Sequence, residues 1–85
     1  MDKLRADEMT YLDKLTPGRR ARVIGYTEDN PVSRRLMELG LFPGREITYL
    51  RNAPLRDPLQ IQVGSTSLSL RHSEASLIAV EETDC

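Results

Sequence analysis

The most constraining feature of this 85-residue sequence is a short segment that carries both a helix start and a helix end. Asn30 can accept hydrogen bonds from the first unpaired N–H groups of a helix, and Pro31 suits the first helical position because it has no N–H to satisfy. Gly40 stands where a left-handed residue commonly ends a helix. The pattern predicts a helix over residues 31–39, and this helix is too short to build the fold by itself.

The apolar residues of this segment predict which side of the helix packs on the core. Val32, Leu36 and Leu39 recur at i, i+4 and i+7, which places them on one buried stripe. Behind the glycine, Leu41 is expected to fold back onto Leu36, as in a Schellman motif.

Strands separated by turns account for the rest of the chain. Pro17-Gly18 and Pro43-Gly44 have the chemistry of tight turns, and Gly64-Ser65 closes a hairpin. Strands are expected over residues 20–27, 46–53, 59–63, 66–70 and 77–81. The predicted fold class is mainly β: a small SH3-like barrel of about five strands with one short α-helix. An OB-fold is the nearest alternative.

Two strand details follow from single residues. Gly25 inside the first strand predicts a bulge or a barrel corner. In the second strand, alternation predicts Ile47, Tyr49 and Arg51 on one face.

Length and composition predict one domain, with a charged extension over residues 1–10, the barrel over 11–81 and an acidic tail over 82–85. No apolar run reaches the roughly 18 residues of a membrane span, and no signal-peptide pattern opens the chain. Cys85 is the one cysteine, so no internal disulfide can form. A cytoplasmic protein that does not insert into the membrane is expected.

Charge is unevenly distributed along the chain. Residues 19–56 hold eight basic residues against four acidic ones, whereas residues 57–85 hold one against five. The net charge of −1 argues against nucleic-acid binding, since dedicated DNA-binding domains are usually basic overall. The basic middle is either an ordinary solvated surface or a docking face for an acidic partner.

Few side chains in this sequence could serve as catalytic groups. His72 is the one histidine, and no nucleophile-elbow, phosphate-loop, dinucleotide-binding or zinc-protease motif is present. We therefore expect no enzymatic activity and no required cofactor.

Metal binding is a weaker alternative. His72 and Glu74 are two residues apart in a predicted turn and could converge on one ion, and the Cys85 thiolate with its terminal carboxylate could chelate another. A transition metal ion, Fe²⁺ or Zn²⁺, could bind weakly there. Specific sites usually cluster three or four ligands, so a polar turn and a solvated tail are the simpler interpretation.

Four stretches in order resemble one family over nearly the whole chain from Leu12 onward. They are RLMELGLFPG at residues 35–44, APLRDP at 53–58, LSLR at 68–71 and LIAV at 77–80. Together they are similar to the ferrous-iron-transport protein A (FeoA) family, whose signature reads R-L-x-x-L-G-[LM]-x-P-G. Arg56 departs from the glycine or lysine of many relatives.

The resemblance implies an SH3-like barrel that serves ferrous iron uptake as a cytosolic accessory protein. Its partner would be the membrane ferrous iron permease, which has a cytosolic GTP-binding domain; docking there would support assembly or activity. A metal carrier or sensor and a modulator of the GTP-binding domain are the alternatives. Weak self-association through the edge strands of the barrel is a further alternative.

We expect the partner-binding surface to consist of the capped helix with its Pro43-Gly44 turn and of the loop from Pro54 to Pro58. Rigid, preorganised segments of this kind lose little conformational entropy on docking. The predicted contact residues are Arg35, Leu36, Met37, Leu41, Phe42, Pro54, Leu55, Arg56 and Asp57.

Overall fold

A computed structural model of the protein describes residues 9–52 and 57–83. Along the chain they form β1 (Met9–Tyr11), the 3₁₀-helix η2 (Leu12–Lys14), β2 (Arg20–Tyr26), α1 (Pro31–Glu38), β3 (Glu46–Asn52), β4 (Leu59–Val63), β5 (Thr66–Leu70), α2 (His72–Ala75) and β6 (Ile78–Glu82). Among these elements, none is a helix long and apolar enough to cross a bilayer.

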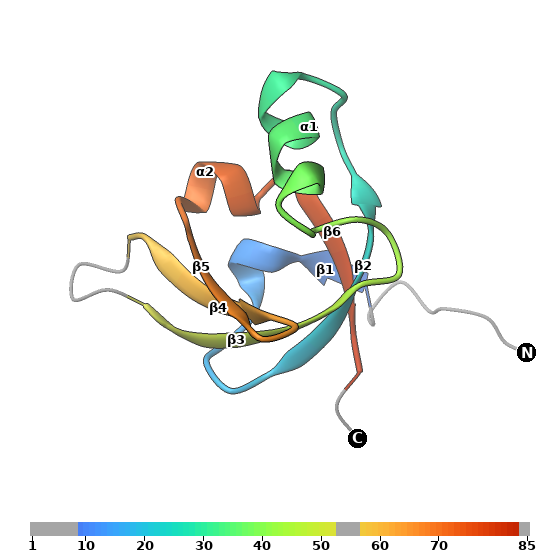
Figure 1. The fold of residues 1–85 in the computed structure, drawn as a ribbon. Helices are drawn as coiled ribbons and strands as arrows, with labels where there is room; N and C mark the ends of the chain where they lie inside the picture. Colours follow the sequence, from blue (N-terminus) through green and yellow to red (C-terminus); the bar gives the residue numbers. More distant parts are fainter. Residues whose placement is uncertain (1–8, 53–56, 84–85) are drawn as a thin grey trace, which may run out of the picture.

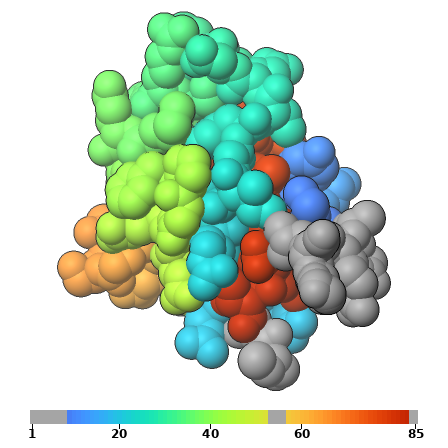
Figure 2. Space-filling view, turned by 90° about the vertical axis from the view of Figure 1, so that its right-hand side faces the viewer, coloured from blue at the N-terminus to red at the C-terminus, as the bar shows by residue number. Residues whose placement is uncertain are grey.

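The described strands form one antiparallel sheet in the order β1-β6-β2-β3-β4-β5. The sheet curls around its own inner face, with α1 at one end (Figure 1). Figure 2 shows the outside of the curl, where β2 runs between β3 and β6. The mainly β prediction is confirmed, with six strands instead of about five. The additional strand is β1, which pairs Met9 with Glu81.

Bulges bend two of the strands. The register of β2 against β6 shifts between Val23 and Gly25, so the bulge predicted at the glycine is confirmed. A second shift lies between Tyr49 and Arg51 in β3. It turns Arg51 to solvent, so the prediction that this residue shares the face of Ile47 and Tyr49 is wrong.

Both ends of α1 have the predicted chemistry. The Ser33 N–H donates to Asn30 Oδ1 and the Asn30 N–H donates to Ser33 Oγ, both at 2.9 Å, which makes a reciprocal cap. At the other end Gly40 has a φ of +113°, and the Leu41 N–H donates to the Leu36 carbonyl at 3.1 Å. The predicted Schellman motif is therefore confirmed.

The predicted buried stripe of α1 is only partly correct. Leu36 is fully buried, but Val32 and Leu39 are exposed, and the other buried position of the helix is Ser33. The reason is that α1 sits on one end of the barrel instead of lying along a sheet face, so the barrel covers a narrow side of the helix (Figure 1).

The hydrophobic core fills the inside of the curled sheet. Strand β4 contributes alternate residues, and Leu12, Leu36 and Leu41 close the ends. The buried apolar residues are Leu12, Leu15, Ala21, Val23, Leu36, Leu41, Ile47, Tyr49, Leu59, Ile61, Val63, Leu70, Ala75, Ile78 and Val80.

Candidate functional site

The structure has a surface hollow of about 410 Å³ between α1 and the end of β5, which we call the α1–β5 groove. Four parts of the fold meet there: α1, the segment before β4, the end of β5, and α2. Its lining residues are Arg35, Leu36, Leu39, Asp57, Pro58, Ser69, Leu70, Arg71 and Glu74.

The floor of the α1–β5 groove is apolar and its rim is charged. Leu36 and Leu70 belong to the core and form the floor, whereas the side chain of Leu39 is 49% exposed and forms part of a wall. Arg35 and Arg71 stand on the rim with most of their side-chain surface in solvent. Such a hollow can hold an apolar side chain while the rim fixes its polar neighbours.

Glu74 ties the two helices of the groove together. Its Oε2 accepts from Arg35 Nη2 at 2.6 Å, and its Oε1 accepts from the Arg71 N–H at 3.0 Å. The first contact joins α1 to α2, and the second caps the start of α2. One carboxylate therefore bonds to both helices that border the groove.

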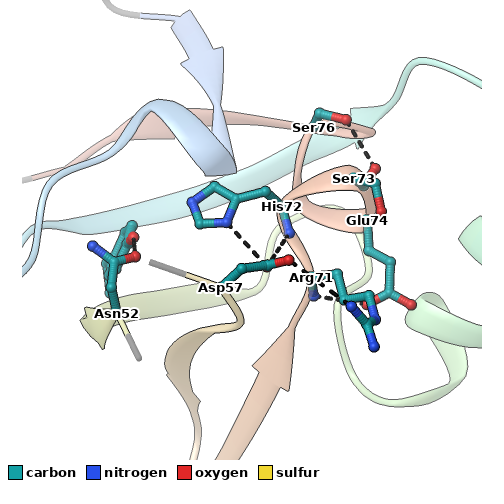
Figure 3. Close-up of polar contacts among 8 residues, drawn as sticks. Asn52, Asp57, Arg71, His72, Ser73, Glu74 and Ser76 are labelled. Atoms are coloured by element: carbon teal, nitrogen blue, oxygen red, sulfur yellow. Dashed lines mark hydrogen bonds and ion pairs between the residues drawn. The ribbon is translucent and has the colours of Figure 1, made fainter. Parts of the chain in front are cut away.

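Asp57 makes the corresponding contact on the other side of α2, as Figure 3 shows. Its Oδ1 accepts from the His72 N–H at 2.9 Å and lies 3.1 Å from the His72 ring Nδ1. The His72 N–H is the main reason that the pKa of the Asp57 carboxyl lies below its usual value, and the ring contact adds to it. The carboxylate therefore stays charged and holds the segment before β4 against α2.

Several predicted partner-binding residues are found in or near this groove, but not all can contact a partner. Arg35, Leu36 and Asp57 line it. Leu36 is fully buried at the floor of the groove, and Leu41 is fully buried and does not line it. Among the leucines that line the groove, Leu39 is the exposed one.

Two other predicted residues lie outside the α1–β5 groove. Met37 lines a smaller hollow of about 240 Å³ with Tyr26 and Pro43. Phe42 is 44% exposed, and the Arg45 guanidinium carbon lies 5.4 Å from the centre of its ring. Pro54, Leu55, Arg56 and Cys85 lie outside the described residues.

The candidate metal ligands His72 and Glu74 lie on α2, but their side chains point in different directions (Figure 3). His72 faces Asp57, and Glu74 faces Arg35. Across residues 9–52 and 57–83, no three His, Cys, Asp or Glu side chains gather in a way that could hold an ion. Because Cys85 is outside that part of the chain, the metal site stays a prediction.

Several groove residues were not named as site residues by the sequence analysis: Leu39, Pro58, Ser69, Leu70 and Arg71. Leu39 was assigned to the buried stripe of the helix, because periodicity cannot show how far a barrel covers a helix. For Arg71 the only signal was its place in the LSLR stretch, which carries no chemistry by itself.

Comparison with known proteins places this geometry in a family. The FeoA domain matches residues 10–82, which is most of the chain. The chain belongs to the FeoA domain family. FeoA structures are also its structural neighbours. A Chlorobium tepidum FeoA protein superposes with a TM-score of 0.82 at 37% identity, over 88% of this chain and 71% of that one.

A second FeoA structure comes from Stenotrophomonas maltophilia, in complex with zinc, and is described as a procaryotic SH3 domain protein. It superposes with a TM-score of 0.75 at 34% identity, over 85% of this chain and 89% of that one. The SH3-like assignment of the barrel is therefore confirmed.

A curated relative carries this kind of domain within a much larger protein. The Fe(2+) transport protein A/Fe(2+) transporter FeoB fusion protein of Porphyromonas gingivalis is 33% identical over 70 residues, which is 82% of this chain. The chain spans 8% of the length of that relative.

Proposed function

We propose that this FeoA-family chain is a non-enzymatic accessory protein of ferrous iron uptake that acts on the cytosolic side of the membrane. It docks on the cytosolic part of the ferrous iron permease and supports its assembly or activity. The observation that carries the proposal is the P. gingivalis fusion, in which a segment similar to this chain is continuous with the FeoB transporter. A fusion holds two modules at high effective concentration, as is useful where separate chains must bind one another.

The surface of the barrel is suited to docking. Leu39 and Phe42 expose large apolar side chains at the C-terminal end of α1, next to the Schellman motif that fixes their backbone. Apolar anchors on a rigid support are typical of interface hot spots, because little conformational entropy is lost when they bind. The Arg35–Glu74 ion pair adds to this rigidity.

A pull-down of the detergent-solubilised permease by the tagged chain tests the proposal. The surface variant is Leu39→Asp, because this side chain is half exposed and can be changed without opening the core. Leu36 is unsuitable, since it is fully buried and a charge there would unfold the barrel. The matched control is Leu50→Asp, an exposed apolar residue on β3 outside the α1–β5 groove.

We expect the wild-type chain and Leu50→Asp to retain the permease, and Leu39→Asp to retain at most a tenth as much. Each variant is first shown to be folded by circular dichroism. Failure of the wild-type chain to retain any permease would refute docking. Equal retention by all three chains would leave docking intact but move it away from the end of α1.

A metal-binding function is the second candidate, and the zinc complex of the S. maltophilia relative is the observation that favours it. Within the described residues the donor set does not fit a tight site, because the His72 and Glu74 side chains are bonded to other residues. Titration with ferrous iron under anaerobic conditions tests this candidate. Saturable binding lost in His72→Ala would support it, and no saturable binding would end it.

A further inference from the structure

Strand β5 is an edge of the sheet, and no strand within residues 9–52 and 57–83 pairs with its outer side. It pairs with β4 through a two-residue turn, so Val63 and Thr66 form the hydrogen-bonded pair that closes the hairpin. Hydrogen bonding alternates along an antiparallel pair, which turns the backbone groups of Leu68 and Leu70 toward β4. The N–H and C=O groups of Ser67 and Ser69 therefore point away from the sheet.

This edge lacks the features that usually protect an edge strand. Proteins block exposed edges with charged residues, proline, bulges or short strands. The sequence of β5 is Thr-Ser-Leu-Ser-Leu, and its pairing with β4 runs without a register shift. The opposite edge, β1, is only three residues long. An open five-residue edge with no charge is a ready template for one more strand.

The open edge runs into the α1–β5 groove. Ser69, Leu70 and Arg71 line one wall, and α1 supplies the wall across from them. A helix facing a free strand edge leaves a slot in which an extended segment can hydrogen-bond to the strand while its side chains reach the helix. The exposed side chain of Leu39 is placed on that second wall.

The unused hydrogen-bond donors of the groove belong to its arginines. The carboxylates are occupied: Glu74 accepts through both oxygens, and Asp57 accepts through Oδ1 from His72. The Arg71 side chain is 75% exposed, and its Nη1 lies 3.9 Å from Asp57 Oδ2. Arg35 bonds Glu74 through one Nη atom and keeps 59% of its side chain in solvent. The groove therefore favours an acidic group beside an apolar one.

We propose that the α1–β5 groove binds an extended, acidic and apolar peptide segment of a partner protein by strand addition to β5. The segment exchanges backbone hydrogen bonds with Ser67 and Ser69. One apolar side chain packs between Leu39 and Leu70, and a carboxylate binds the donors of Arg71 and Arg35. The inference rests on the proposed docking function, to which it adds the binding mode and the chemistry of the bound segment.

A synthetic peptide tests the binding mode without the permease. The probe is an acetylated, amidated octapeptide that alternates aspartate with valine and leucine. Titration into the ¹⁵N-labelled chain should give saturable shifts centred on the Ser67 and Ser69 amides and slow the hydrogen exchange of both. A peptide with every backbone amide methylated cannot donate to the strand and should produce no such shifts. The same peptide with lysine in place of aspartate should bind at least tenfold more weakly.

Two variants identify the groove as the place of binding. Ser69→Pro removes one outward N–H at an edge position, where proline is tolerated, and should weaken peptide binding at least fivefold. Arg71→Glu should weaken it at least tenfold. Its control, Arg34→Glu, changes an arginine of α1 that does not line the groove and should bind as the wild type does. No saturable shift up to millimolar peptide, equal binding of the lysine peptide, or unchanged binding by Arg71→Glu would overturn the proposal.

The permease separates this inference from the docking proposal. If the wild-type chain retains the permease and Ser69→Pro does not, both stand. If both chains retain it equally and the Ser67 and Ser69 amides exchange as fast as in the free chain, docking stands and strand addition is refuted for this partner. If neither chain retains the permease, docking fails, and the peptide titration still decides whether the groove binds an extended segment.

Discussion

Gly40 is the residue whose backbone conformation matters most for the end of α1. Its φ of +113° lies in a region that side chains disfavour, while a Cβ there would lie 3.5 Å from Val63 Cγ1, an ordinary contact. The cost of substitution therefore comes from the backbone and not from a clash. Gly40→Ala should lower the free energy of unfolding by about 1–2 kcal/mol, measured by urea denaturation.

Gly25 is the control for that prediction. It lies at the bulge of β2 without a positive φ, and no atom within 4 Å would meet its Cβ. Gly25→Ala should change the free energy of unfolding by no more than about 0.5 kcal/mol. Equal losses at the two glycines would contradict the Schellman argument, because they would point to a general cost of added side chains.

The Tyr26 hydroxyl donates to the Leu41 carbonyl at 2.7 Å, and burial raises the pKa of Tyr26 to about 12. The pKa in the unfolded chain is about 10, so folding favours the neutral phenol. This contribution to stability is complete below pH 10 and is lost as the pH rises through 12. A tyrosinate absorbance titration should show a late component that Tyr26→Phe removes. Complete titration of the wild type near pH 10 would contradict this.

At the scale of elements, the N-terminal cap of α1 can be tested separately from the packing of Leu36. Asn30→Ala removes the acceptor of the Ser33 N–H and should cost about 1 kcal/mol, or about 4–8 °C in Tm for a domain of this size. Asn30→Asp keeps the acceptor and should keep most of the stability. Thermal unfolding followed by circular dichroism measures both, and a loss in Asn30→Asp as large as in Asn30→Ala would show that the cap is not what matters.

Elements whose signals are local could be predicted from the sequence. The cap at Asn30, the glycine at Gly40 and the turn at Gly44 depend on neighbouring residues alone, and each is found as expected. Strand β1 was missed because three residues with both faces partly exposed carry no alternation. The predicted sheet face of Arg51 was wrong, because the bulge in β3 depends on how this strand pairs with β4. Where a strand bulges, and how much of a helix the barrel covers, depend on tertiary contacts. The periodicity of the sequence does not show these contacts.

At the scale of the whole molecule, the α1–β5 groove could not be predicted, because its walls come from segments as far apart as Arg35 and Glu74. The sequence did identify Arg35 and Asp57 through the two stretches that resemble the family. It put both Leu36 and Leu39 on the buried stripe and also named Leu36 as a partner contact, whereas the packing of the barrel end buries Leu36 and leaves Leu39 exposed. The family signature therefore marked the region, and only the fold could separate its buried residues from its exposed ones.

The fold also brings together charges that the sequence keeps apart. The basic middle and the acidic end of the chain meet where β2 pairs with β6, on the face shown in Figure 2. Arg19 Nη2 lies 2.8 Å from Glu82 Oε1, and Arg22 Nη1 lies 3.8 Å from Glu81 Oε2. Exposed pairs of this kind add little stability, but here each sets a carboxylate against an arginine of the basic middle.

Because carboxylates of β6 lie beside arginines on the β2–β6 face, we expect the chain not to bind polyanions, although its middle is basic. We expect the wild-type chain to pass through a heparin column at about 0.15 M salt, where exposed charges are screened beyond about 8 Å. The double variant Glu81→Lys and Glu82→Lys leaves Arg19 and Arg22 unopposed by those two carboxylates and should be retained and elute with salt. The control, Glu28→Lys and Glu38→Lys, makes the same change in net charge outside the β2–β6 face and should be retained less. Retention of the wild type would show that the ion pairs do not mask the basic surface, and polyanion binding would have to be considered again.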